Sequence, residues 1–186
     1  MKLIPLLSIF FFFISLPSIS KETWILDNSI SNIDFELPIF LANNVKGTFK
    51  NIEGLVEINL NTKKNKAIFF VDLSSIEINY DKYKNLLLSN VFFNTLKFPK
   101  AVIDTKKFSY KNENLINLDV ELSIKGVTNS VPLSLEVISL TEELIQIKGK
   151  VKFSRTKFQI GTGKWSNTSI LKDRVNIDIN LFFFKK

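Results

Sequence analysis

The stretch Ile116-Asn117-Leu118-Asp119-Val120-Glu121-Leu122-Ser123-Ile124 alternates apolar and polar residues without interruption. Successive side chains of a β-strand point to opposite faces, so this stretch predicts a strand with one apolar face and one hydrated face. A helix would instead repeat its apolar residues every three to four positions. The stretch therefore predicts an antiparallel sheet that covers an apolar interior.

The same alternation recurs along most of the chain. It predicts strands at residues 24–27, 33–37, 45–49, 56–60, 68–78, 101–110, 114–126, 130–140, 144–155 and 173–184. Allowing for a bent pair, eight or nine strands joined by short turns indicate a β-sandwich or an up-and-down barrel. The interior of such a barrel is either filled by side chains or holds one small ligand. Between Tyr80 and Thr95 the period of two is lost, which predicts a short helical insertion over a barrel mouth.

An outer-membrane barrel is the main alternative at this level, because its strands alternate in the same way with inside and outside exchanged. Three features argue against it. The chain ends in Lys185-Lys186, it lacks obvious aromatic girdles flanking each strand, and it carries the helical insertion.

Residues 1–20 have the pattern of a cleaved secretory signal. Met1 and Lys2 precede an apolar stretch over residues 3–16, which ends near Ser18-Ile19-Ser20. A membrane helix needs about 20 apolar residues, so a permanent anchor is the weaker alternative for this shorter stretch. We therefore expect an exported protein whose mature part, residues 21–186, is a single domain.

The composition argues against most cofactor and metal chemistry. The chain has no Cys and no His, and its one Met is Met1. The mature part thus lacks the ligands of structural zinc, of copper and of most haem sites, and no loop has calcium-binding spacing. Without His there is no Ser-His pair, and no nucleophile elbow is present. We expect no cofactor, no metal and no enzyme activity, with a hydrolase or isomerase acting on a bound lipid as an alternative.

The net charge is +7, or +6 once the signal and its Lys2 are removed. Such an excess favours an anionic membrane surface or an anionic ligand head group, and export makes nucleic acid an unsuitable partner. Lysines on outward strand faces, such as Lys148, Lys150 and Lys152, are also typical of an ordinary solvated surface. A homodimer is left open.

Several short motifs resemble, in their order, those of the YceI-like family of exported lipid-binding proteins. The resemblance implies a lipocalin-like antiparallel barrel, periplasmic in Gram-negative bacteria, whose elongated cavity holds a polyisoprenoid or similar long-chain amphiphile. It implies no established catalytic activity. The motifs lie at residues 24–27, 45–49, 71–76, 89–94, 98–101, 122–133, 153–161 and 171–175.

The resemblance also has departures. Histidines common in the family are replaced here by Ile30, Ile39 and Leu86, and the usual Arg-Asp pair reads Tyr83-Lys84. If those groups contact a ligand head group in relatives, head-group selectivity is expected to differ in this chain.

The candidate ligand wall consists mainly of phenylalanines, for which ordinary core packing is the competing interpretation. Val151 and Phe153 are predicted to point inward, so continued alternation also points Arg155 inward. A charge buried in this way needs a partner. That partner would be a carboxylate such as Asp27, Asp72 or Asp173, or an anionic ligand head group. The predicted ligand-binding residues are Phe35, Phe49, Phe69, Val71, Ile76, Phe92, Phe93, Phe98, Phe108, Leu122, Ile124, Leu133, Phe153, Arg155, Phe158 and Trp165.

These observations predict an exported carrier that holds a long apolar molecule, such as a polyisoprenoid or quinone-like lipid, in a barrel cavity. The alternative is a barrel with a filled interior whose basic surface binds a membrane or an inner-membrane redox partner.

Overall fold

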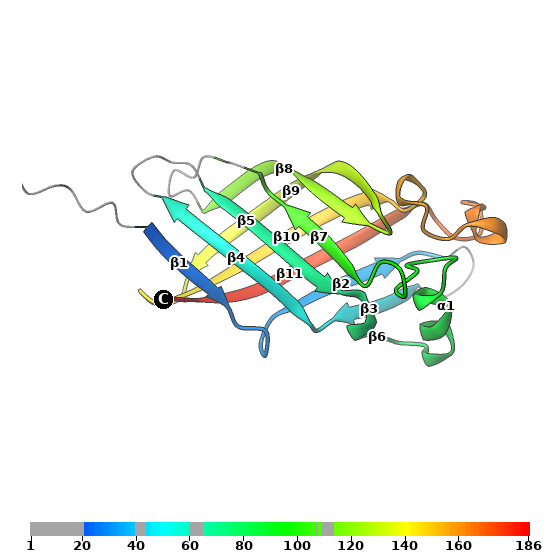
Figure 1. Ribbon diagram of the computed structural model, residues 1–186, viewed down its shortest axis with the longest axis horizontal. Helices are drawn as coiled ribbons and strands as arrows, with labels where there is room; N and C mark the ends of the chain where they lie inside the picture. The colour runs from blue at the N-terminus through cyan, green and yellow to red at the C-terminus, as the bar shows by residue number, and fades with distance from the viewer. Residues whose placement is uncertain (1–20, 40–43, 60–64, 107, 109–113) are drawn as a thin grey trace, which may run out of the picture.

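The computed structural model describes residues 21–39, 44–59, 65–106, 108 and 114–186, which form a closed antiparallel β-barrel (Figure 1). The predicted signal, residues 1–20, lies outside this part of the chain, as do residues 40–43, 60–64, 107 and 109–113. The strands are β1 (Lys21–Leu26), β2 (Asn32–Leu37), β3 (Val45–Phe49), β4 (Ile52–Asn59), β5 (Lys66–Asp72), β6 (Ile76–Ile78), β7 (Lys100–Asp104), β8 (Leu115–Ile124), β9 (Val127–Ser139), β10 (Leu144–Ser154) and β11 (Arg174–Lys185).

Eight strands close the ring in the order β1-β4-β5-β7-β8-β9-β10-β11, and β11 pairs back onto β1. The strand β11 is shared between two partners. Its residues 176–180 pair with β2, and its residues 183–185 pair with β1. The strands β2, β3 and β6 therefore extend the wall beyond β1, β4 and β5. The predicted eight-stranded antiparallel barrel is confirmed.

The predicted strand at residues 68–78 is broken into β5 and β6. The carboxylate of Asp72 accepts a hydrogen bond from the backbone N–H of Ser74 at 2.8 Å, and the hydroxyl of Ser75 donates to the carbonyl of Asp72 at 2.6 Å. These local bonds compete with the sheet and produce a 3₁₀ turn at Leu73–Ser75. The helical insertion predicted near residues 80–95 is present as the 3₁₀ turn Asp81–Tyr83 and α1 (Lys84–Leu88).

The strand predicted at residues 101–110 also ends early. β7 ends at Asp104. At the next residue, the backbone N–H of Ala67 donates to the side-chain hydroxyl of Thr105 at 2.8 Å, where a regular ladder would use a backbone carbonyl as the acceptor. Lys106 then adopts a left-handed backbone, with φ of 54°, and its N–H donates to the carboxylate of Asp104. A side-chain turn thus replaces the ladder at this point.

The two ends of the barrel differ in construction (Figure 1). At the terminal end, β1 begins and β11 ends. At the helical end lie α1 and the connection between β10 and β11, residues 155–173, which contains the 3₁₀ turns Thr156–Phe158 and Gly163–Ser166.

Arg155 holds this connection in place from inside. Its side chain is fully buried, and its guanidinium donates to four backbone carbonyls. Nη2 donates to Leu171 at 2.7 Å, Nη1 to Ile160 at 2.9 Å and Gly161 at 3.3 Å, and Nε to Lys172 at 3.0 Å. The sequence predicted a carboxylate or a ligand head group as partner. The hydrogen bonds go instead to carbonyl groups of the loop that surrounds Arg155.

The carboxylate of Asp173, one of the expected partners, acts on the Arg155 guanidinium through its charge, while the backbone N–H of Arg155 donates to the Asp173 carbonyl at 2.9 Å. Burial lowers the pKa of the Arg155 guanidinium, and the charge of Asp173 opposes that shift. The carboxylate of Asp173 itself accepts hydrogen bonds from the backbone and hydroxyl of Thr156. The Asp173 carboxylate is therefore not a hydrogen-bond partner of the Arg155 guanidinium, although the backbones of the two residues are bonded.

A second cation ties three loops together at the helical end. Lys125, in the turn between β8 and β9, donates from Nζ to the carbonyl of Gln159 at 2.8 Å and to that of Val91 at 3.2 Å. The backbone N–H of Gly161 donates to the same Val91 carbonyl. Burial lowers the pKa of Lys125. The helical end is thus secured by cations that bind backbone carbonyls.

Replacement of Arg155 by Met, which keeps most of the volume, leaves several buried carbonyls without a donor. We expect the free energy of unfolding, measured by urea denaturation, to fall by about 3 kcal/mol or more. The matched control is Arg174→Met, an exposed arginine at the start of β11, which should stay within about 0.5 kcal/mol of the unchanged protein. Equal effects of the two substitutions would contradict the structural role of Arg155.

Candidate ligand-binding cavity

Two contacts between a phenylalanine and a glycine keep the centre of the barrel open. Phe69 of β5 lies opposite Gly54 of β4, and Phe35 of β2 lies opposite Gly47 of β3. A Cβ atom at Gly54 would collide with the Phe69 ring, and one at Gly47 would lie 2.7 Å from Cζ of Phe35. Each ring therefore lies against the neighbouring strand instead of crossing the interior. Glycine marks such a close approach within a strand.

The larger cavity occupies the half of the barrel near the terminal end and has a volume of about 470 Å³. Its wall is built from the inward faces of strands on every side of the ring and is mostly aliphatic. The apolar lining residues are Trp24, Ile33, Val56, Ala67, Phe69, Ile103, Phe108, Ile116, Leu118, Leu133, Leu135, Val137, Ile145, Ile147, Ile179 and Leu181.

A smaller cavity of about 100 Å³ continues the column toward the helical end. It shares four wall residues with the larger one: Ile33, Ile103, Leu133 and Ile179. Leu87 of α1 and Phe92 and Phe93 from the segment after it close this part of the column. The remaining lining residues are Phe35, Leu37, Phe49, Val71, Leu73, Ala101, Val120, Leu122, Ile124, Val131, Val151, Phe153, Ile160, Val175 and Ile177, all of them apolar.

Polar groups in the lining gather at the terminal end. Thr141 and Glu142 of the β9–β10 turn and Lys185 of β11 line the larger cavity and are exposed to solvent, so the cavity reaches the surface there. Lys185 Nζ lies 6.0 Å from the centre of the Trp24 ring. The indole N–H of Trp24 is buried without a hydrogen-bond partner among the described residues. An apolar column with a polar mouth suits an amphiphile with a long tail.

Most predicted wall residues line one of the two cavities. Phe69 and Phe108 line the larger cavity and Leu133 lines both. The residues of the prediction that line the smaller cavity alone are Phe35, Phe49, Val71, Phe92, Phe93, Leu122, Ile124 and Phe153.

Five predicted residues line neither cavity. Ile76, Arg155 and Phe158 are fully buried in the packing around the column. Phe98 packs against Gly126 beneath the ammonium group of Lys97, and Trp165 packs on Phe92 with ring centres 5.9 Å apart.

Sequence reasoning missed most of the aliphatic wall of the larger cavity. These residues include Ile116, Leu118, Leu135, Val137, Ile145, Ile147, Ile179 and Leu181. All eight belong to strands that the alternation predicts, so the inward positions of those strands carried the signal. The emphasis on aromatic residues drew attention to the helical end instead.

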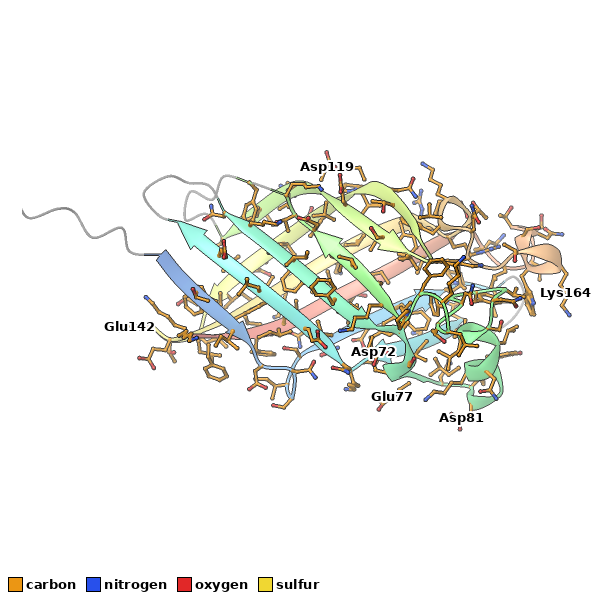
Figure 2. All side chains as sticks on the ribbon, viewed as in Figure 1. Asp72, Glu77, Asp81, Asp119, Glu142 and Lys164 are labelled. Carbon is orange, nitrogen blue, oxygen red and sulfur yellow. The ribbon has the colours of Figure 1, made fainter. Side chains whose placement is uncertain are left out.

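The acidic side chains of the described residues do not gather at one place. Figure 2 shows Asp72, Glu77, Asp81, Asp119 and Glu142 spread along the molecule. Within the described residues, no group of three or more acidic residues could hold a metal ion. No helix in the same residues is long and apolar enough to span a bilayer.

Comparison with known proteins gives relatives with the same architecture. A UPF0312 protein of Staphylococcus aureus is 32% identical over 111 residues, a match that covers 59% of this chain and 62% of the relative. The chain therefore spans about three fifths of that relative's length. The crystal structure of BcnA from Burkholderia cenocepacia superposes with a TM-score of 0.76 at 22% identity and covers 84% of this chain and 98% of BcnA.

A polyisoprenoid binding domain from Saccharophagus degradans superposes with a TM-score of 0.71 at 15% identity, covering 88% of this chain and 98% of that domain. At these identities the two structures establish the fold alone. The model of the YceI-like domain matches residues 24–183, which is nearly all of the barrel. The chain belongs to the YceI-like family.

Proposed function

We propose that this protein binds a long apolar molecule, a polyisoprenoid or another long-chain lipid, along the column formed by the two cavities. The observation that carries this proposal is the apolar wall that the two cavities share. It extends from the polar mouth at Glu142 to Phe93 at the helical end. Each buried CH₂ group contributes about 0.8 kcal/mol, so a chain of tens of carbons is held tightly even after the cost of ordering it. A structural neighbour named as a polyisoprenoid binding domain supports this choice of ligand class.

The first test narrows the larger cavity with Ala67→Phe. Ala67 lines that cavity, and its backbone bonds to Thr105 do not involve its side chain. The added ring displaces about two CH₂ groups of a bound tail, so affinity should fall about tenfold. Uptake of a fluorescent long-chain lipid, together with mass spectrometry of solvent extracts, measures the effect.

The matched control is Val102→Phe in β7, whose side chain points outward and lines neither cavity. It adds a ring outside the barrel and should leave uptake unchanged. A protein that takes up no isoprenoid or other long-chain lipid, and yields none on extraction, would refute the proposal. Comparing the recovered lipid with the added one also shows whether any turnover occurs.

We further propose that the protein is exported and acts as a periplasmic carrier, on the basis of the signal pattern in residues 1–20. Expression of the full chain in a Gram-negative host, followed by mass measurement of the periplasmic fraction, should give a mature chain that begins near Lys21. A full-length chain recovered only from the membrane fraction would contradict cleavage.

A membrane surface is the partner that we propose for loading and release. Three outward side chains near the terminal end, Ile25, Leu55 and Phe184, are 48%, 44% and 44% exposed. Cross-strand pairing places Ile25 beside both others, and Leu144 and Ile68 extend the row on either side. These five residues, the outer apolar row, cross five neighbouring strands.

The position and charge of the outer apolar row favour a bilayer over a second copy of the chain. Its neighbours Trp24 and Lys185 line the larger cavity, so docking there brings the polar mouth to the lipid. The net charge, which is +6 once the signal is removed, favours an anionic surface. A stable dimer buries about 800 Å² per partner, more than one row of partly exposed side chains supplies.

Replacing Ile25 and Phe184 together by Ser should lower binding to vesicles that contain anionic phospholipid by about tenfold, because partly exposed apolar groups no longer enter the interface. Co-sedimentation measures the bound fraction. Leu96→Ser is the control, because Leu96 is fully exposed at the helical end. Concentration-dependent dimers that disappear in the double variant would show that a second copy covers the row.

A further inference from the structure

The backbone pairing of β9 with β10 ends before the two strands do, and beyond its end the Asn129 side chain donates across to the carbonyl of Lys157 at 3.2 Å. Their pairing runs from Ile145–Ser139 to Val151–Leu133 and stops there. Yet β9 begins earlier, at Val127, and β10 continues to Ser154. The unpaired parts of the two strands therefore face a gap, which we call the lateral slot. It lies at residues 127–132 of β9 and 152–154 of β10.

Pro132 explains why the pairing stops at this point. Continued register would place Pro132 opposite Lys152, but proline has no backbone N–H to donate to the ladder. The pairing of β9 with β8 continues past Pro132 to Val127 and Ile124, so the missing donor falls on the β10 side. Proline inside a sheet is tolerated where a strand is unpaired on one side. The residue therefore fixes one border of the lateral slot.

A cleft of about 420 Å³ lies in the lateral slot on the outside of the barrel. Two of its lining residues, Val131 and Phe153, also line the smaller cavity inside. The half-buried ring of Phe153 packs edge-on against Phe158, with centres 5.1 Å apart. These side chains form the partition between the outer cleft and the apolar column.

The charge of the cleft is predominantly positive. Lys152, Lys157 and Arg174 line it, are exposed, and make no ion pair among the described residues. The one acidic lining residue is Asp173, whose carboxylate accepts hydrogen bonds from Thr156. Burial raises the pKa of Asp173, but its hydrogen bonds from Ser154 and Thr156, with the charge of Arg155, hold that pKa below the usual value. The cleft therefore has three cations without an ion pair and one carboxylate, that of Asp173, which is already hydrogen-bonded.

We propose that the lateral slot is a binding site for the anionic head group of an amphiphile, with the tail passing Phe153 into the apolar column. Phosphate or carboxylate oxygens are the chemistry that Lys152, Lys157 and Arg174 recognise. The inward neighbours of the slot are all apolar, so a tail that enters there meets no polar group before the larger cavity. The proposal deepens the proposed function and rests on it, because it requires a tail in the column.

The test compares a prenyl monophosphate with the prenyl alcohol of the same chain. Binding of both is measured by fluorescence displacement at low and at high salt. In the unchanged protein the phosphate should bind about tenfold more tightly at low salt, and the difference should shrink as salt screens the charges. Lys152→Glu combined with Arg174→Glu should abolish this difference and leave the binding of the alcohol within about twofold.

The matched control is Lys148→Glu. Lys148 lies on the same outward face of β10, is exposed, and does not line the cleft. It changes the net charge in the same direction, so an equal loss of phosphate preference with Lys148→Glu would show a long-range charge effect and overturn the site.

A second variant leaves the charge unchanged. Pro132→Thr restores a backbone N–H opposite Lys152, which lets the pairing of β9 with β10 extend across the slot. The preference for the phosphate should fall about as much as with the charge reversals. An unchanged preference, with hydrogen exchange showing a newly protected amide at residue 132, would overturn the slot as the entry point of the tail.

The outcomes separate the two proposals. If neither ligand binds, the proposed function fails. If both bind equally and the charge reversals change nothing, a tail is held but the slot does not bind its head group. If inorganic phosphate displaces the prenyl monophosphate at the same concentration as the monophosphate itself, the cleft is a simple anion site and the tail plays no part.

Discussion

The pairing of β1 with β11 is the contact on which the interior depends, because it turns an open sheet into a ring. Three residue pairs, from Trp24–Lys185 to Leu26–Phe183, make this closure, with flanking backbone bonds from Asp27 to Phe182 and from Lys186 to Thr23. Residues 176–180 of β11 pair with β2 instead. Once the ring is closed, the apolar side of each strand faces inward. The glycines at positions 47 and 54 then decide that the inside is a column rather than a filled core, since they let two phenylalanine rings lie against the wall. Hydrogen-bonded closure and two missing side chains are both necessary for a cavity.

The two ends of the column are held by different kinds of interaction. At the helical end, Arg155 and Lys125 are buried or partly buried and donate to backbone carbonyls of loops that are distant in sequence. Such bonds are strong only while water is kept away, which the aromatic cover of Phe92 and Trp165 provides. At the terminal end, polar residues line the cavity and reach solvent. The terminal end is thus open to solvent, whereas at the helical end loops cover the column and the lateral slot lies beside them.

The sequence predicted the barrel well because alternation is a local property that one strand reveals by itself. It predicted the breaks less well. The turn after Asp72 and the early end of β7 at Asp104 depend on side-chain hydrogen bonds that compete with the ladder, and a pattern of apolar residues does not register them. For the site, the prediction named the five phenylalanines that line the smaller cavity, but it left out the aliphatic residues of the larger one, from Ile116 to Leu181. The hydrogen-bond partners of Arg155 could not be predicted, because they are backbone carbonyls, which every residue has.

Ligand selectivity in this barrel has to arise at the openings and not along the column. The lining of the smaller cavity is apolar throughout, and an apolar wall distinguishes two tails only by length and shape, at about 0.8 kcal/mol for each CH₂ group. The openings are chemically distinct, since Glu142 and Lys185 stand at the terminal end and Lys152, Lys157 and Arg174 at the lateral slot. An amphiphile placed in the column therefore gains its polar contacts at one opening or the other, and those contacts fix its direction. Proteins with this same barrel can then differ in ligand through a few residues at the openings while the wall stays unchanged.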